Sequence, residues 1–139
     1  MIRFTIPGLR LPNHSNGSRG VSVAAMHARR READKIRGSV AMMARVRMRG
    51  LRLAVGTDVT VTVTRVAPSV GLDAHDNLRT ACKPAVDGLA DALGVGNDRD
   101  QRVSWRYDQR RGEWAVEVEI APRETCPTCG AVVRGGRVA

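Results

Sequence analysis

The chain is poor in aromatic residues and in cysteine. Its 139 residues include only four aromatic side chains, Phe4, Trp105, Tyr107 and Trp114. A surface that binds single-stranded nucleic acid by stacking uses several aromatic rings, so the composition argues against that class of protein. Three cysteines are too few for a disulfide framework.

Long apolar runs are missing as well. No stretch of about 18 apolar residues occurs, and the sequence therefore predicts no transmembrane helix. The first seven residues lack the apolar core of a secretory signal, so we expect a cytoplasmic protein. The length fits one domain with a modest core. We expect this domain to span residues 1–121 and a flexible C-terminal tail to span residues 122–139.

Acidic side chains are scarce in the first part of the chain. Residues 1–52 contain 12 basic residues (Lys and Arg) but only 2 acidic residues (Asp and Glu). Residues 53–139 contain 11 basic and 12 acidic residues. A basic segment beside an acid-bearing one fits phosphate binding by the first and metal binding by the second. An arginine-rich protein from a high-GC genome would carry the same net charge, so charge alone does not decide between the two interpretations.

Hydrophobic periodicity predicts the elements. Alternation of apolar and polar residues indicates strands over residues 2–6, 58–66, 102–108 and 114–120, the last two around a turn at 109–112. Apolar residues at three-and-four spacing indicate helices over residues 21–49 and 78–93. The order β-α-β-α-β-β predicts an α+β fold, a small mixed sheet of about four strands packed with two main helices.

The first predicted helix is strongly basic. Its apolar stripe comprises Ala33, Ile36, Val40 and Met43, with Val46 as a further candidate. Arginine pairs with phosphate through a bidentate fork, so we expect the basic side chains of this helix to contact the DNA backbone. These side chains are Arg29, Arg30, Arg31, Lys35, Arg37, Arg45 and Arg49. A basic helix that is merely solvated is the alternative.

The second predicted helix has a clear buried face and a proline. Its apolar positions are Leu78, Ala81, Cys82, Ala85, Leu89, Ala92 and Leu93. Asp76 or Asn77 is the expected N-cap, and Gly94 the expected C-terminal stop. Pro84 removes a backbone hydrogen bond and clashes with the preceding turn, which predicts a kink or a helix in two pieces.

Aspartates gather on both sides of this helix. Residues 72–105 contain six of them. Carboxylate oxygens suit Mg²⁺ or Mn²⁺, so we predict that Asp73, Asp76, Asp98 and Asp100 hold one or two such ions, with Lys83 adding positive charge to the transition state. Each residue also has a simpler explanation: a helix cap, a Lys83–Asp87 surface ion pair, or ordinary turn residues.

The motif CPTCG at residues 126–130 looks like one knuckle of a zinc ribbon. A closed structural zinc site has four ligands, and no second CxxC follows. Two chains could share a zinc through this tail. The simpler expectation is that Cys126 and Cys129 bind none.

Taken together, these motifs resemble the RusA family of Holliday junction resolvases, especially its phage and prophage members. The resemblance rests on Asp76-Asn77-Leu78, on Lys83 followed by Asp87-Gly88-Leu89, and on Asn97-Asp98 and Val103. The resemblance covers roughly residues 58–120 and is weaker in the N-terminal strand and the loop after it. The chain departs from the family pattern at Ala74, where an acidic residue is usual, and in its longer spacing from Asp76 to Lys83.

The resemblance implies a homodimeric, Mg²⁺-dependent endonuclease that nicks branched DNA symmetrically. It implies Asp76 and Asp98 as metal ligands and Lys83 as the catalytic lysine. We therefore expect an enzyme that resolves Holliday junctions or other branched DNA by phosphodiester hydrolysis, in recombination, repair or phage DNA processing. A non-catalytic DNA-binding protein on the same scaffold is the alternative, and a small structural or regulatory phage protein is a third interpretation.

Overall fold

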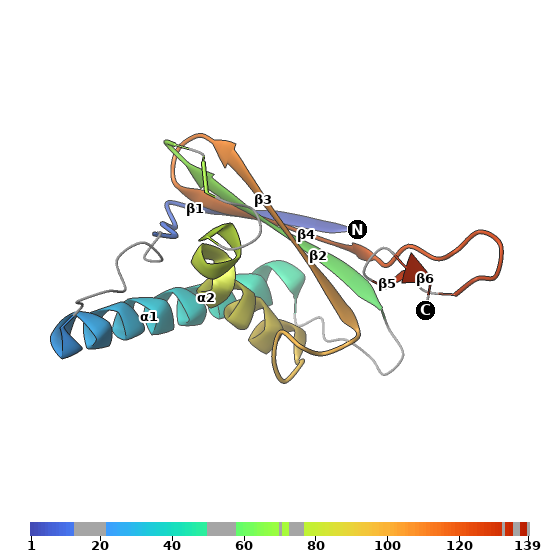
Figure 1. Ribbon diagram of the computed structural model, residues 1–139, viewed down its shortest axis with the longest axis horizontal. Coiled ribbons are helices and arrows are strands. Elements are labelled where there is room, and N and C mark those ends of the chain that lie inside the picture. The colour runs from blue at the N-terminus through green and yellow to red at the C-terminus, as the bar shows by residue number, and fades with distance from the viewer. Residues whose placement is uncertain are drawn as a thin grey trace.

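The main sheet of the protein has four strands in the order β1-β4-β2-β3. The computed structural model describes residues 1–12, 22–49, 58–69, 71–72, 77–131, 133–134 and 137–138. The strands are β1 (Ile2–Pro7), β2 (Val59–Ala67), β3 (Val103–Arg111) and β4 (Ala115–Pro122). The helices α1 (Val23–Met48) and α2 (Asn77–Leu93) both cover one face of the sheet (Figure 1). The predicted α+β fold and element order are confirmed.

Two short strands follow this core. β5 (Val133–Arg134) and β6 (Arg137–Val138) pair with each other in an antiparallel sheet of their own. None of the helices in the described part of the chain has the length and apolar character needed to span a membrane.

Alternation along the strands separates the two faces of the sheet. Val61 and Val63 of β2 are fully buried, and Val116 of β4 is as well. The threonines of β2 and the glutamates of β4 alternate with these residues and are more exposed. Successive side chains of a strand point to opposite faces, so the helices cover the apolar face and the polar face stays open.

Strands β3 and β4 are not neighbours, although only residues 112–114 separate them. β2 lies between them, parallel to β3 and antiparallel to β4. The turn predicted at residues 109–112 is therefore misplaced, since β3 continues to Arg111 and the connection crosses the end of β2. The Gly112 N–H donates to the carbonyl of Ala67 at 3.0 Å. A Cβ at Gly112 would lie 2.9 Å from Cγ1 of Val66, so a larger residue there would force the buried Val66 to shift.

Helix α1 is capped at its start and buried only in its second half. The Ser22 Oγ accepts the Ala25 N–H at 3.2 Å. The buried residues are Ile36, Val40, Ala41, Ala44 and Met48. The predicted stripe is correct at Ile36 and Val40 but wrong at Val46, which is 68% exposed. Val46 lies two residues from both Ala44 and Met48, and at 3.6 residues per turn it faces away from them.

Helix α2 is one continuous element that runs through Pro84. Of the two predicted alternatives, a helix in two pieces is therefore wrong, and a kink at Pro84 stays a prediction. Gly94, in the left-handed region with φ +75°, follows its last residue, as predicted. The two helices approach closely at Gly88, where a Cβ would lie 2.5 Å from the carbonyl oxygen of Arg37. Arg37 also donates to both carboxylate oxygens of Asp91, at 2.7 and 2.9 Å.

Two buried arginines tie chain segments to the sheet. Nε of Arg65 donates to the carbonyl of Leu11 at 2.9 Å, and its guanidinium lies over the Trp114 ring. Arg123, directly after β4, pairs with Asp58 at 3.0 Å and donates to the carbonyl of Gln101. These contacts fix the segment after β1 and the ends of β2, β3 and β4.

Candidate functional site

Lys83 and Asp98 meet although 15 positions separate them in the sequence. The Nζ of Lys83, on α2, lies 2.8 Å from Oδ2 of Asp98, in the loop that follows the helix. The same Nζ donates to Oδ1 of Asp87, one turn further along α2, at 2.9 Å. One ammonium group therefore holds two carboxylates, and the i,i+4 pair with Asp87 is only part of its contacts.

Local turn chemistry brings Asp98 to this position. The side-chain oxygen of Asn97 accepts the Arg99 N–H at 2.8 Å, the pattern of an Asx turn. The carbonyl of Ala90 accepts the Val95 N–H at 3.1 Å, which closes the end of α2. The loop thus turns sharply after the helix and presents Asp98 to its side.

A cavity of about 320 Å³ lies at this ion pair. Its lining consists of Arg79, Thr80, Lys83, Asp98 and Arg99. Three of these residues are cationic and one is anionic, so the cavity suits an anionic group. Arg79 lies four residues before Lys83 and thus on the same face of the helix. Neither arginine was among the predicted site residues; the spacing to Lys83 could have indicated Arg79, and adjacency to Asp98 could have indicated Arg99.

Tyr107 on the sheet is electrostatically coupled to Arg79 and Asp98 of the cavity. It lies on β3 and packs partly buried against the core. Burial raises the pKa of Tyr107, while the charge of Arg79 and a hydrogen bond with it act in the opposite direction. The phenol therefore stays protonated at neutral pH.

The electrostatics favour the ion-paired state of Lys83 and Asp98. The hydrogen bond from Lys83 lowers the pKa of Asp98 more than burial raises it. Burial would lower the pKa of Lys83, but its hydrogen bonds with Asp98 and Asp87 and the charges of both carboxylates raise it overall. Lys83 is thus protonated, and Asp98 ionised, at neutral pH.

The other predicted metal ligands do not join Asp98 among the described residues. Asp100 is held by Arg102, whose backbone N–H, Nε and NH2 groups donate to it at 2.9, 3.0 and 2.8 Å. These hydrogen bonds lower the pKa of Asp100 to about 2, and its side chain does not line the cavity. Asp73 and Asp76 lie outside the described residues, although Asp76 directly precedes α2 in the sequence.

The two carboxylates at Lys83 are hard oxygen donors, although the Lys83 ammonium already lies on both of them. Asp87 and Asp98 each place a carboxylate oxygen on the same ammonium nitrogen, and such oxygens are what Mg²⁺ prefers. Across the described ranges, no group of three or more His, Cys, Asp or Glu side chains could hold a metal ion. A complete site would therefore need further oxygen ligands, and the sequence offers Asp73 and Asp76 next to the start of α2.

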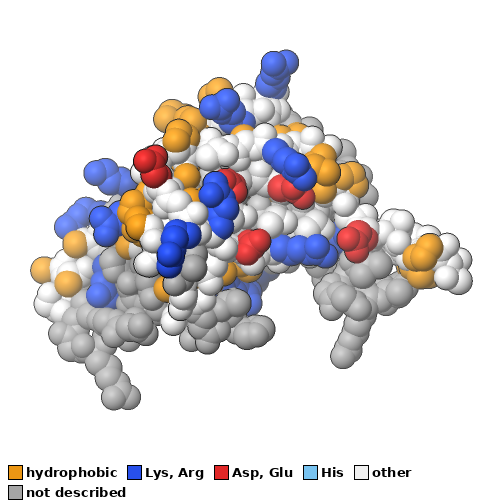
Figure 2. Space-filling view, turned by 90° about the horizontal axis from the view of Figure 1, so that it is seen from above, with side chains coloured by type: hydrophobic (Ala, Val, Ile, Leu, Met, Phe, Trp, Pro, Cys, Tyr) orange, Lys and Arg blue, Asp and Glu red, His pale blue; other side chains and the backbone are white. Residues whose placement is uncertain are grey.

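The basic residues predicted to bind DNA lie along α1 and, for Arg49, at its C-cap, and all but the half-exposed Arg29 are exposed. Arg37 is engaged by Asp91, which raises its pKa. Lys and Arg side chains gather at the end of the molecule where the first half of α1 extends beyond the sheet (Figure 2). This placement leaves most of these charges accessible to a polyanion.

A groove of about 310 Å³ connects this helix to the cavity. Its lining consists of Pro12, Arg29, Arg30, Glu32, Ala33, Ile36, Thr80, Ala81, Lys83 and Pro84. Thr80 and Lys83 line both the groove and the cavity. The basic helix, the groove and the Lys83–Asp98 pair therefore form one continuous surface.

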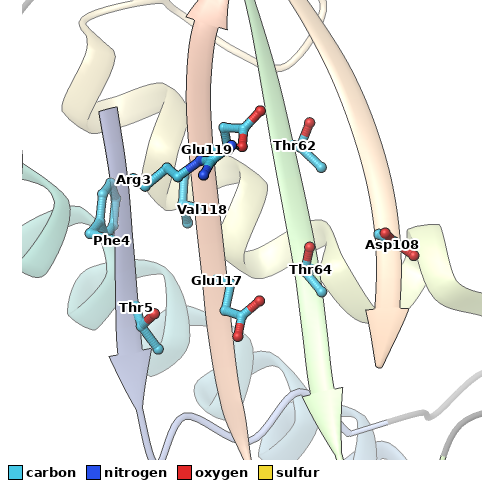
Figure 3. A pocket seen from close by; sticks show the side chains of 9 residues that line it. All are labelled: Arg3, Phe4, Thr5, Thr62, Thr64, Asp108, Glu117, Val118 and Glu119. Carbon is cyan, nitrogen blue, oxygen red and sulfur yellow. Dashed lines mark hydrogen bonds and ion pairs between the residues drawn. The ribbon is translucent and has the colours of Figure 1, made fainter. Parts of the chain in front are cut away.

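A larger hollow of about 480 Å³ lies on the open face of the sheet (Figure 3). Asp108, Glu117 and Glu119 contribute carboxylates to it, and the rest of the lining consists of Arg3, Phe4, Thr5, Thr62, Thr64 and Val118. Arg3 pairs with Glu119 at 2.7 Å, and Arg110 pairs with Glu117. Its carboxylates would repel phosphate, so despite its size it is a poorer candidate for DNA than the cavity at Lys83.

No family model matches the chain, and no curated protein matches it. Its function is therefore inferred from the residues of the cavity, from the surface around them and from the motifs of the sequence.

Proposed function

We propose that the protein is an endonuclease that uses Mg²⁺ or Mn²⁺ to hydrolyse phosphodiester bonds in four-way junctions or other branched DNA. In this proposal it acts as a homodimer in the cytoplasm, in recombination, repair or phage DNA processing. The observation that carries the proposal is the cationic cavity in which Lys83 holds Asp98, at the end of a groove that leads to the basic helix α1.

The cavity would receive the scissile phosphate. Arg79 and Arg99 flank Lys83, and guanidinium groups bind phosphate oxygens through paired hydrogen bonds. The exposed arginines of α1 would bind phosphates on either side of the cut and so orient the duplex. Backbone contacts of this kind give affinity and register rather than sequence preference.

Lys83 would act as an electrostatic stabiliser. Its pKa is raised, so at neutral pH it remains protonated and is not a general base. A fixed ammonium beside the scissile phosphate stabilises the negative charge that develops there during hydrolysis. Asp87 and Asp98 keep this ammonium in position before the substrate binds.

Asp98, together with Asp73 and Asp76, would hold the metal ion. When bound, the ion would supply an activated water and neutralise charge on the phosphate. Asp100 is the weaker candidate in this set, since Arg102 already engages both of its oxygens.

A second candidate function is DNA binding without cleavage. Lys83 with its two carboxylates is a satisfied ion-pair cluster by itself, and Ala74 replaces an acidic residue that is usual in the resembling family. This candidate uses the same surface and differs only in whether the carboxylates are needed for a reaction.

Cleavage of a labelled four-way junction with Mg²⁺ or with EDTA distinguishes the two. We expect metal-dependent paired nicks from the wild type and a loss of about a hundredfold or more for Asp98→Asn, Asp76→Asn and Lys83→Met. Asp108→Asn is the matched control, because Asp108 lies on β3 but lines the hollow of the open face. Junction binding in EDTA should survive in Asp98→Asn.

Each contrary outcome has a definite meaning. Tight junction binding with no nicks from the wild type would contradict the nuclease and favour the DNA-binding protein. Normal cleavage by Asp76→Asn would remove Asp76 from the metal site. A wild-type protein that neither bound nor cleaved the junction would contradict both candidates.

A further inference from the structure

The CPTCG segment after β4 forms a tight turn with two free thiols. Cys126 is half-buried and Cys129 is exposed. The carbonyl of Cys126 accepts the Gly130 N–H at 2.9 Å, and the Cys126 N–H donates to the carbonyl of Ala131 at 2.7 Å. Gly130 has φ +70°, which a residue with a Cβ adopts only with strain. The motif is therefore folded into a defined loop, and β5 and β6 follow it as a short hairpin.

These two backbone hydrogen bonds hold Cys126 and Cys129 in one turn, with an exposed thiol at its end. CxxC is the ligand spacing of structural zinc sites, and cysteine binds metals as the thiolate.

We propose that Cys126 and Cys129 form half of a Zn²⁺ site, which a second copy of this chain completes with the same two cysteines. The four thiolates would give the tetrahedral set that structural zinc sites use. Contact between identical patches on two copies is what a two-fold axis produces. Thiolates are soft ligands, so the site would prefer Zn²⁺ to Mg²⁺ and differs in kind from the carboxylates at Lys83.

The described residues of one chain do not supply the remaining two ligands. The third cysteine, Cys82, is fully buried in the core and cannot reach an exposed loop. No third His, Cys, Asp or Glu joins the pair within the ranges that the structure describes. The segment after β4 extends beyond the sheet, where a second copy can approach it (Figure 1).

Titration of the reduced full-length protein with Co²⁺ tests this site without DNA. Tetrahedral thiolate coordination gives Co²⁺ intense charge-transfer and visible absorption, and Zn²⁺ should displace it. We expect saturation at half an equivalent of Co²⁺ per chain, and native mass spectrometry should find two chains with one metal ion. Cys126→Ser and Cys129→Ser should abolish the absorption, whereas Cys82→Ala, which removes the third thiol only, should retain it.

Three results would overturn the proposal. They are saturation at one equivalent in a monomer, an unchanged spectrum in Cys126→Ser and Cys129→Ser, and no tetrahedral spectrum in the wild type. Because the readout is spectroscopic and involves no nucleic acid, failure of the proposed nuclease activity leaves this test unaffected, and the reverse also holds.

Discussion

At the scale of single residues, the most informative feature is an ammonium group shared by two carboxylates. The side chain of Lys83 is 49% exposed, while that of Asp98 is only 18% exposed. Water screens a half-exposed pair, so we expect it to contribute less than about 1 kcal/mol to stability. Its importance lies in holding Lys83 and Asp98 in fixed positions beside Arg79 and Arg99.

The pH dependence of stability should reveal this pair. The pKa of Asp98 is lowered in the folded protein, mainly by Lys83 and in smaller part by Arg99. Its stabilisation is therefore fully present above the unfolded pKa of about 3.9 and is lost as the pH falls through the lower folded value. The difference in unfolding free energy between wild type and Lys83→Met should shrink as the pH drops below about 4. Urea unfolding at a series of pH values measures it, and a difference that grows on acidification would contradict the assignment.

At the scale of elements, the contact between α1 and α2 depends on a glycine. A Cβ at Gly88 would meet the Arg37 carbonyl oxygen at 2.5 Å, and Val40 and Ala41 lie close as well. The obstacle is backbone, so it cannot rotate away as a side chain would. The helices therefore pack with their backbones close together, and the ion pair between Arg37 of α1 and Asp91 of α2 joins them beside this point.

Substitution of two glycines should give opposite results. Gly88→Ala gains up to about 1 kcal/mol of helix propensity, but the clash should destabilise the protein by roughly 1–3 kcal/mol. Gly38→Ala is the matched control, because a Cβ there meets nothing within 4 Å and α1 should gain about 0.5–1 kcal/mol. Chemical denaturation measures both, and a stabilised Gly88→Ala would contradict the close approach.

At the scale of the whole molecule, charge is distributed by face and by end. The first half of α1 carries its cations beyond the sheet, whereas the open face mixes arginines with glutamates and Asp108 (Figures 1 and 2). A duplex is therefore expected along α1 and the groove, and not on the open face. In that orientation, one phosphate of the proposed DNA substrate would reach the Lys83 cavity.

The salt dependence of DNA binding should report this orientation. Each lost phosphate contact lowers the slope of log K against log salt concentration by about 0.9. The triple substitution Arg30→Gln, Arg31→Gln and Lys35→Gln should therefore flatten the slope by about one for each contact that it removes. Arg106→Gln, on the open side of β3, should leave it unchanged. Fluorescence anisotropy in EDTA gives the slopes, and a larger effect of Arg106→Gln would place the DNA on the other face.

Much of the fold followed from the sequence because it depends on local pattern. The valine alternation of β2 and the stripe of α2 predicted their elements to within a residue or two, since one buried face imposes the period of each element. The prediction that Gly94 ends α2 was also correct, because the backbone there has φ +75°, which favours glycine. The predicted burial of Val46 was wrong because the spacing of apolar residues on a long helix is compatible with more than one buried face. Only packing against the rest of the protein selects one of them.

The tertiary structure decided what depends on contacts between distant segments. The local sequence pattern does not predict that β2 lies between β3 and β4, or that α2 continues through Pro84. The sequence predicted Lys83 and Asp98 as partners in one site. Their direct contact, the position of Arg79 beside them and the pairing of Asp100 with Arg102 depend on how the loop after α2 folds back against the helix. Composition and periodicity thus determined the elements and the charge of this protein. Only packing of the loop against α2 determined which charges face the cavity, because that geometry joins residues that no local period relates.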